Sequence, residues 1–336
     1  MRLEEKHLLT AIRLTIWSAV IVLLIVVACV IWLFLPHEPS KEPVDLKEAT
    51  SVLSAWQAPD STTIPQTPEG DLIRYGQELI AHTAIYLGPS GTVAQISNGM
   101  NCQNCHLKAG KKWKGNNYAA VAATYPKYRA RSGMQESIEK RVNDCLERSL
   151  NGQPLEQTSH EMKAMVAYIR WVGSGVRKEA IPAGTGITDL SLLDRTADGG
   201  KGKFIFSARC SRCHGLSGEG LRKPGSNEWL YPPLWGEGSF NNGAGLLRLS
   251  RLAGFIHDNM PYDSVDSKSK LTTAEAWDVA AFISAQPRPA RDFSLDWPNI
   301  TEKPFDHPFG PYPDDFTEEQ HRFGPFGPIV QARKKD

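Results

Sequence analysis

Hydrophobic and polar positions divide the chain into segments of different character. Residues 15–35 read TIWSAVIVLLIVVACVIWLFL, which is 21 residues without a charge. As a helix this run would be about 31 Å long, close to the hydrocarbon thickness of a bilayer. Residues 36–68 are rich in proline, serine and charge, which predicts a tether. Two later segments, starting at Thr158 and Thr272, place apolar residues on one face of a helix.

These two amphipathic segments close the two halves of a degenerate repeat. Each has Thr followed three residues later by Glu, which predicts a helix starting with a capping box. Aligning Thr158 with Thr272 superposes Tyr168 on Phe282. Each half also opens with a helix-like segment that carries a glycine. The segment is residues 73–80 with Gly76 in the first half and residues 200–206 with Gly202 in the second. An opening helix, a long connection and a closing helix predict a small all-α module.

The repeat sets the predicted domain organisation. We expect an all-α protein in which one N-terminal transmembrane helix precedes two small helical modules. The expected segments are a cytoplasmic N-terminus at residues 1–14, a membrane anchor at 15–35, a linker at 36–68, a first module at 69–186, a second module at 187–290 and a tail rich in proline and aromatic residues at 291–336.

The charge balance excludes one class of function. Lys and Arg number 38 and Asp and Glu 37, which gives a net charge of +1. No basic field is therefore available to hold nucleic acid, and any anion site must be local.

The flanks of the apolar run predict its orientation. Arg2, Lys6 and Arg13 precede it, which places the N-terminus in the cytoplasm. No small-residue cleavage site follows a shorter apolar region, so we expect an uncleaved single-pass anchor. Cys29 is interpreted as a lipid-facing residue, with a lipoprotein-like Cys as the alternative. The expected location is the bacterial inner membrane, with both modules on the periplasmic side.

Four of the six cysteines fall in two Cys-x-x-Cys-His motifs, the attachment signature of haem c. The motifs comprise Cys102, Cys105 and His106, and Cys210, Cys213 and His214. Two covalently attached haem c groups are therefore expected, with each histidine as an iron ligand. An opening helix, this motif and a closing helix predict that both modules are of the class I cytochrome c type. A zinc half-site or a redox dithiol is the alternative.

The second axial ligand separates an electron carrier from a reaction centre. Met260 lies 12 positions before Thr272, and no other methionine follows His214. Met260 is therefore the expected ligand of the second iron. The corresponding place in the first half is Cys145, 13 positions before Thr158. The alternatives are an inert, buried Cys145 and ligation by Met134.

The neighbours of Cys145 are cationic. A helix would place Arg141, Cys145 and Ser149 on one face, with Arg148 one turn further round. Arg129 and Arg131 lie upstream. Positive charge favours the reactive thiolate, and guanidinium groups bind oxyanions through paired hydrogen bonds. A thiolate, a haem and arginines together suit a small sulfur oxyanion, whereas the alternative is a solvated basic helix face.

Several segments resemble the dihaem thiosulfate dehydrogenases, also called tetrathionate synthases. The similar segments are Asn101–His106, Tyr125–Arg129, Arg141–Cys145, Ser149–Gly152, Cys210–Gly215, Tyr231–Gly236, Phe240–Gly245, Gly310–Tyr312 and Gly324–Ile329. The likeness implies that two thiosulfates couple to tetrathionate with release of two electrons, in a reaction that can also run in reverse.

The resemblance also implies residue roles. Cys145 would be both the distal ligand and the covalent sulfur carrier, and Arg131, Arg141 and Ser149 would line the substrate pocket. Some members have a Lys-Met pair where this chain has Leu246-Leu247, which leaves Met260 as the constant ligand.

We therefore expect a membrane-anchored oxidoreductase that passes electrons to an external cytochrome or another periplasmic or membrane acceptor. The rival interpretations are a non-catalytic dihaem electron carrier and a dihaem peroxidase. His307 and His321 of the tail are interpreted as solvated or structural.

Overall fold

The computed structural model describes residues 17–27, 56–263 and 270–334. The chain divides into two units, residues 1–51 and 52–336. In the first unit, residues 17–27 form a helix, whereas Cys29 and the remainder of the predicted span 15–35 lie outside the described residues. No helix within the described ranges combines the length and the apolar character needed to cross a bilayer.

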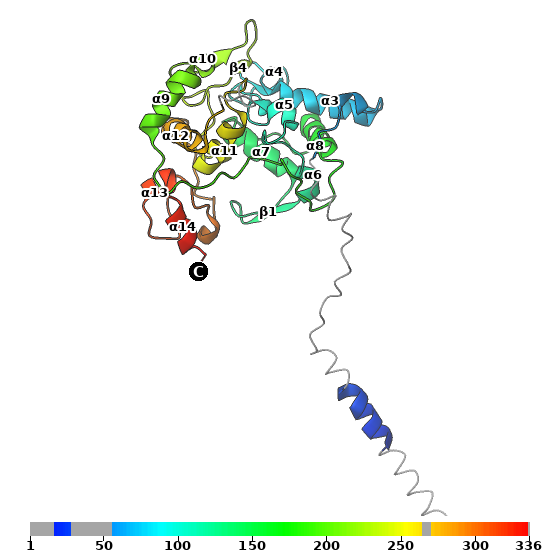
Figure 1. The fold of residues 1–336 in the computed structure, drawn as a ribbon. Coiled ribbons are helices and arrows are strands. Elements are labelled where there is room, and N and C mark those ends of the chain that lie inside the picture. Colours follow the sequence, from blue (N-terminus) through cyan, green and yellow to red (C-terminus); the bar gives the residue numbers. More distant parts are fainter. Residues whose placement is uncertain (1–16, 28–55, 264–269, 335–336) are drawn as a thin grey trace, which may run out of the picture. The chain divides into compact units, whose positions relative to one another are not determined.

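The second unit is mostly helical and contains both predicted modules (Figure 1). Its α-helices are α3 (Pro68–Ala81), α4 (Thr83–Leu87), α5 (Leu107–Gly110), α6 (Val121–Thr124), α7 (Ile138–Arg148), α8 (His160–Val172), α9 (Gly199–Arg209), α10 (Ser211–His214), α11 (Leu249–Asn259), α12 (Thr273–Ser284), α13 (Glu318–Phe323) and α14 (Gly327–Ala332). Short 3₁₀ helices are η1 (Ser61–Thr63), η2 (Cys102–Asn104), η3 (Gly245–Leu247) and η4 (Ile300–Glu302).

Two short hairpins depart from the all-α prediction. Strand β1 (Lys127–Arg129) pairs antiparallel with β2 (Met134–Glu136), and β3 (Leu221–Arg222) with β4 (Trp229–Tyr231). Both are insertions between helices, and neither has the apolar alternation that would have predicted a strand.

A close helix crossing joins the two ends of each module. A Cβ on Gly76 of α3 would lie 2.0 Å from the carbonyl oxygen of Ala164 in α8, and one on Gly202 of α9 would lie 1.9 Å from that of Asp278 in α12. The same glycines face Tyr168 and Phe282. Only glycine permits this backbone approach. The crossings confirm the predicted equivalence of Tyr168 and Phe282.

The two closing helices begin differently. Thr272 and Glu275 form the predicted capping box, in which the Glu275 N–H donates to Thr272 Oγ1 (3.2 Å) and the Thr272 N–H to Glu275 Oε2 (2.8 Å). The predicted start at Thr158 is wrong by one residue, because Ser159 caps α8 and accepts from the Met162 N–H. Glu161 instead accepts a hydrogen bond from the Tyr75 hydroxyl of α3, at 3.2 Å.

Each module has its own hydrophobic core. The first core includes Met162 and Met165, which supports the interpretation of these methionines as core residues. It also contains Phe240 and Leu247 from beyond the predicted module boundary. The second core is centred on α9, α11 and α12 and includes Ile329 of the tail. The two modules and the tail therefore share packing.

Buried polar groups also attach the tail to the second module. Asp306 accepts hydrogen bonds from the Ser250 N–H (3.0 Å) near the start of α11 and from Arg248 (2.7 Å). His321 is fully buried between the carbonyl of Phe305 (2.7 Å) and Asp314 (2.8 Å). His307 is buried as well. The structural interpretation of both histidines is confirmed, and the solvated one is wrong.

The helix crossing predicts a specific sensitivity to side-chain volume. Gly202→Ala should destabilise the holoprotein by about 1–3 kcal/mol, because the added methyl group forces α9 away from the Asp278 carbonyl. In Gly199→Ala, on the same helix, the nearest atom to the new methyl lies at 3.9 Å, so this control should be neutral or slightly stabilising. Guanidinium unfolding followed by circular dichroism measures both. Equal unfolding midpoints would contradict the crossing.

Candidate functional site

The first haem-attachment motif has the geometry of a metal-binding histidine beside two available thiols. Cys102 and Cys105 are both free thiols. The Nδ1 atom of His106 lies 2.6 Å from the carbonyl oxygen of Asn116. With Nδ1–H donating to that carbonyl, Nε2 keeps its lone pair for a metal. Burial lowers the pKa of His106 to about 4, which keeps the ring neutral as ligation requires.

The second motif repeats this arrangement. Cys210 and Cys213 are free, and Nδ1 of His214 lies 2.9 Å from the carbonyl oxygen of Pro232. Burial lowers the pKa of His214 as well. In both modules a pair of thiols and an imidazole with an available Nε2 form the donor set that haem c requires, so the residues present fit two haem groups.

Helix α7 brings Cys145 to the first motif. The helix starts at the Ser137 cap, whose hydroxyl accepts from the Lys140 N–H. Burial raises the pKa of Cys102 to about 11 and that of Cys105 to about 12, and the charge of a Cys145 thiolate contributes to both increases. The three sulfur atoms therefore lie within electrostatic reach of one another. This is the neighbourhood that the prediction of Cys145 as distal ligand requires.

Arg141 lies one turn before Cys145 on α7. The pKa of the Arg141 guanidinium group is raised, mainly by negative charge on Cys145 and despite the opposing effect of burial. Within the described part of the chain, no carboxylate lies within 4.0 Å of the Arg141 guanidinium. Asp144 and Glu136 also raise the pKa of Arg141, but from beyond ion-pair distance. The half-buried guanidinium group therefore keeps N–H donors without a direct carboxylate partner.

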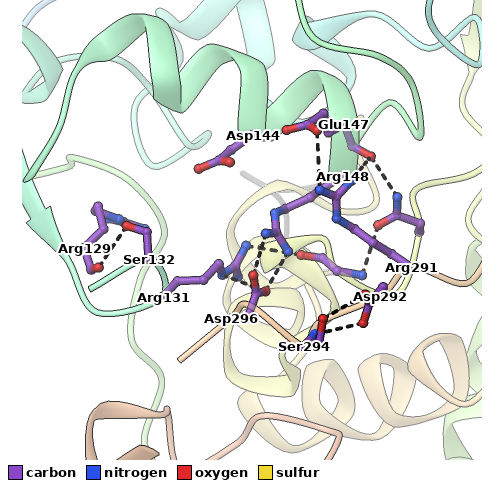
Figure 2. Close-up of polar contacts among 12 residues, drawn as sticks. Arg129, Arg131, Ser132, Asp144, Glu147, Arg148, Arg291, Asp292, Ser294 and Asp296 are labelled. Carbon is purple, nitrogen blue, oxygen red and sulfur yellow. Dashed lines mark hydrogen bonds and ion pairs between the residues drawn. The ribbon is translucent and has the colours of Figure 1, made fainter. Parts of the chain in front are cut away.

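The other arginines of this region are already bound. Figure 2 shows Arg131 and Arg148 converging on Asp296 of the tail. Arg148 is buried and donates two hydrogen bonds of 2.7 Å to Asp296. Arg148, predicted one turn further round the helix from Cys145, is therefore paired with a carboxylate 148 residues further along the chain. Sequence reasoning missed Asp296, since nothing in its local sequence indicates the pairing.

Arg131 has an intermediate position. Its Nη1 donates to the Gly243 carbonyl (3.2 Å), and its Nε lies 3.9 Å from Asp296. Burial and the charges of Arg148 and Arg141 lower the pKa of Arg131 to about 10. The three guanidinium groups thus lie near one another, with Asp296 bound mainly by Arg148.

Ser149 and Met134 differ in their relation to Cys145. Ser149 ends α7, and its N–H donates to the Cys145 carbonyl at 2.8 Å, which places it one turn beyond Cys145 as predicted. Met134 lies on β2 opposite Arg129 and is 56% exposed. The structure therefore gives no support to Met134 as the alternative ligand.

Met260 ends α11 at the edge of the second core. Arg212, inside the second motif, and Asp263 form an exposed ion pair (2.6 Å), which places the segment after Met260 beside the haem-attachment site. Leu246 packs against the second core and Leu247 within the first. Neither leucine carries an atom that could bind iron.

Glu228 is a further residue that the sequence did not single out. It is buried, and its Oε1 accepts from the side chain of Asn101 (3.0 Å) and lies 2.7 Å from Nδ1 of His82. Asn101 precedes Cys102 and also accepts from the Ala84 N–H (2.8 Å). The β3–β4 hairpin of the second module therefore supports the start of the first motif.

Comparisons with known proteins agree on one family. The SoxA/TsdA cytochrome c domain model matches residues 92–177, and the cytochrome c model matches residues 200–286. A thiosulfate dehydrogenase of Allochromatium vinosum is 37% identical over 239 residues, which are 70% of this chain and 85% of that protein. One of Psychrobacter arcticus is 35% identical over 243 residues, which are 72% of this chain and 71% of that protein.

A solved structure extends the likeness to three dimensions. Thiosulfate dehydrogenase (TsdBA) from Marichromatium purpuratum, in its "as isolated" form, aligns with a TM-score of 0.65 and 32% identity. The alignment covers 70% of this chain and 50% of the solved chain, so this protein spans about half the length of that structure.

The Arg148–Asp296 pair predicts a stability effect. Asp296→Ala should destabilise the protein by about 3–5 kcal/mol, because the buried Arg148 charge loses its partner. Asp189→Ala is the control, since the Arg251–Asp189 pair is solvent-exposed and should contribute less than about 1 kcal/mol. Unfolding midpoints in guanidinium measure both, and similar small losses would contradict the assigned role of Asp296.

Proposed function

Because the chain belongs to the thiosulfate dehydrogenase family, we propose that it couples two thiosulfate anions to tetrathionate with release of two electrons. One observation carries this proposal. Cys145 lies within electrostatic reach of the first pair of haem-attachment cysteines, and Arg141, one turn away, has no carboxylate partner within 4.0 Å among the described residues. A nucleophilic sulfur and an available cation therefore meet at one site.

Arg141 has the chemistry to hold the substrate. Its guanidinium group can donate paired hydrogen bonds to the sulfonate oxygens of thiosulfate, which leaves the outer sulfur facing Cys145. Arg131 and Ser149 are assigned to the same pocket, with Arg131 adding positive charge and Ser149 a hydroxyl one turn beyond the cysteine.

Cys145 is assigned as the covalent carrier. Its thiolate forms a bond with the outer sulfur of the first thiosulfate, and two electrons leave as the Cys–S–S–SO₃⁻ adduct forms. The outer sulfur of the second thiosulfate then attacks the bonded sulfur. The new sulfur–sulfur bond completes tetrathionate, the bond to Cys145 breaks, and the thiolate is restored. Tetrathionate reduction is the same sequence in reverse.

Two c-type haems supply two one-electron acceptors, which matches a two-electron coupling. His106 and Cys145 are assigned as ligands of the first iron, and His214 and Met260 as ligands of the second. Electron donation by a thiolate ligand favours the oxidised state of the first iron, whereas His/Met ligation favours the reduced state of the second iron. This difference directs electrons from the substrate side toward the second module.

The cellular setting forms part of the proposal. An uncharged run of 21 residues after three basic residues supports a single-pass anchor in the bacterial inner membrane, with the modules in the periplasm. An external cytochrome, or another periplasmic or membrane carrier, is assigned as the electron acceptor.

The carrier role of Cys145 predicts a separation of chemistry from haem attachment. Cys145→Ala should abolish thiosulfate-dependent reduction of an artificial acceptor, because the covalent step loses its sulfur. Both haems should stay attached, since the four attachment cysteines are intact, and intact-protein mass spectrometry checks this. Cys145→Met, which can bind iron but cannot carry the substrate, should also be inactive. Normal turnover in either variant would refute the mechanism.

The anion-binding role of Arg141 predicts a loss in kcat/KM. Arg141→Ala should lower it about 10–100-fold, the equivalent of about 1.5–3 kcal/mol for hydrogen bonds to a charged group. Arg141→Lys should recover part of the loss, because the charge remains but the paired geometry does not. Arg170→Ala, an exposed position on α8, is the control and should match the wild type. Unchanged kinetics in Arg141→Ala would contradict the pocket.

A further inference from the structure

Two segments contact each other at the boundary between the modules. One follows the predicted haem ligand His106, and the other contains the predicted haem ligand Met260. We call residues 107–117, which follow His106, the proximal loop, and residues 257–262, which contain Met260, the distal loop. The side chain of Asn259, at the end of α11, is fully buried where these loops meet. This junction takes no part in the substrate chemistry described above.

Asn259 links the two loops directly. Its Nδ2 donates to the Lys114 carbonyl of the proximal loop (3.0 Å) and to the Phe255 carbonyl of its own helix (3.1 Å). Both partners are acceptors, so only the NH₂ end of the amide can serve them. The Oδ1 atom is buried without a hydrogen-bond partner. Leaving this acceptor unpaired costs free energy. The amide nevertheless keeps this orientation, because its two N–H donors bond to Lys114 and Phe255.

Other contacts hold the same two loops together. The side chain of Asp258 is only 5% exposed and lies 3.9 Å from Lys114 Nζ, with Thr188, His257 and Lys270 as its other partners. Lys112 Nζ lies 4.5 Å from the ring centroid of Tyr262. The two loops are therefore joined by three contacts, which we call the junction: Asn259 with Lys114, Asp258 with Lys114, and Tyr262 with Lys112.

The junction forms a short chemical path between the ligands of the two haems. The path starts at the His106 ring, whose Nδ1 bonds to the Asn116 carbonyl (2.6 Å). It follows the backbone from Asn116 to Lys114 and crosses to Asn259 through one hydrogen bond of 3.0 Å. Met260 is the next residue along the chain. Only two hydrogen bonds and a few peptide units separate the two assigned ligands.

We propose that Asn259 is a positioning residue for electron transfer between the haems: its hydrogen bond to Lys114 holds the distal loop against the proximal loop, and so couples the Met260 side of the second haem to the His106 side of the first. With both haem groups bound, each transfer would oxidise the haem held by His106 and reduce the haem held by His214 by one electron, and would move no bond or proton. The inference rests on the proposed ligation by Met260.

The test uses the full-length holoprotein with both haems bound. A flash-activated ruthenium donor injects one electron, and absorbance follows its redistribution between the haems. Asn259→Ser keeps a hydroxyl that can reach the Phe255 carbonyl within the helix but is too short to bond Lys114. Its inter-haem rate should fall several-fold. Tyr262→Ala, at a ring that is 51% exposed, should give a smaller decrease and serves if the serine variant does not fold.

Asn98→Ser is the matched control, because Asn98 also donates to a carbonyl across the module boundary, that of Ser239 at 3.0 Å, but not to a ligand loop. Its inter-haem rate should equal that of the wild type. An unchanged rate in Asn259→Ser and Tyr262→Ala, or an equal decrease in Asn98→Ser, overturns the inference. A wild-type protein without a methionine–iron charge-transfer band refutes the Met260 assignment of the proposed function, and this inference with it.

Discussion

The unequal pairing of the arginines around α7 is the constraint on which the rest of the structure depends. Asp296 binds Arg148 through two hydrogen bonds of 2.7 Å, whereas Arg141 keeps no carboxylate within 4.0 Å in the described part of the chain. Burying a guanidinium group is costly unless an anion compensates it. Arg141 lies one turn from Cys145, and negative charge on Cys145, with smaller contributions from Asp144 and Glu136, raises the pKa of its guanidinium group. Because none of these carboxylates is in direct contact with it, the guanidinium group can still donate hydrogen bonds to a sulfur oxyanion.

The site is assembled from parts of the chain that lie far apart. Asp296 belongs to the tail, and Glu228 to a hairpin of the second module that supports Asn101 beside the first attachment cysteine. Leu247 packs in the core of the first module although it lies in the second half of the sequence. The two modules are therefore not independent cytochromes joined by a linker. The second module and the tail shape the environment of the first haem site.

Local patterns predicted the parts of the structure that local physics determines. Helix periodicity located the closing helices, and the alignment correctly paired Tyr168 with Phe282. The Cys-x-x-Cys-His spacing predicted two donor sets, and in the structure each consists of two free thiols and a histidine whose Nδ1 lies beside a backbone carbonyl. The start at Thr158 was wrong because Glu161 binds Tyr75 on another helix. The pairing of Arg148 with Asp296 and the burial of His321 depend on tertiary contacts, which leave no periodic signal in the sequence.

Electron paramagnetic resonance of the oxidised full-length holoprotein tests the central claim most directly, because the g values of a low-spin ferric haem report its axial ligands. The account predicts one species with histidine and thiolate ligands and one with histidine and methionine, and loss of the thiolate species alone in Cys145→Ala. Two histidine–methionine species would mean that Cys145 does not bind the first iron and would favour a simple electron carrier. A high-spin first haem would mean an open iron site and would equally contradict the account.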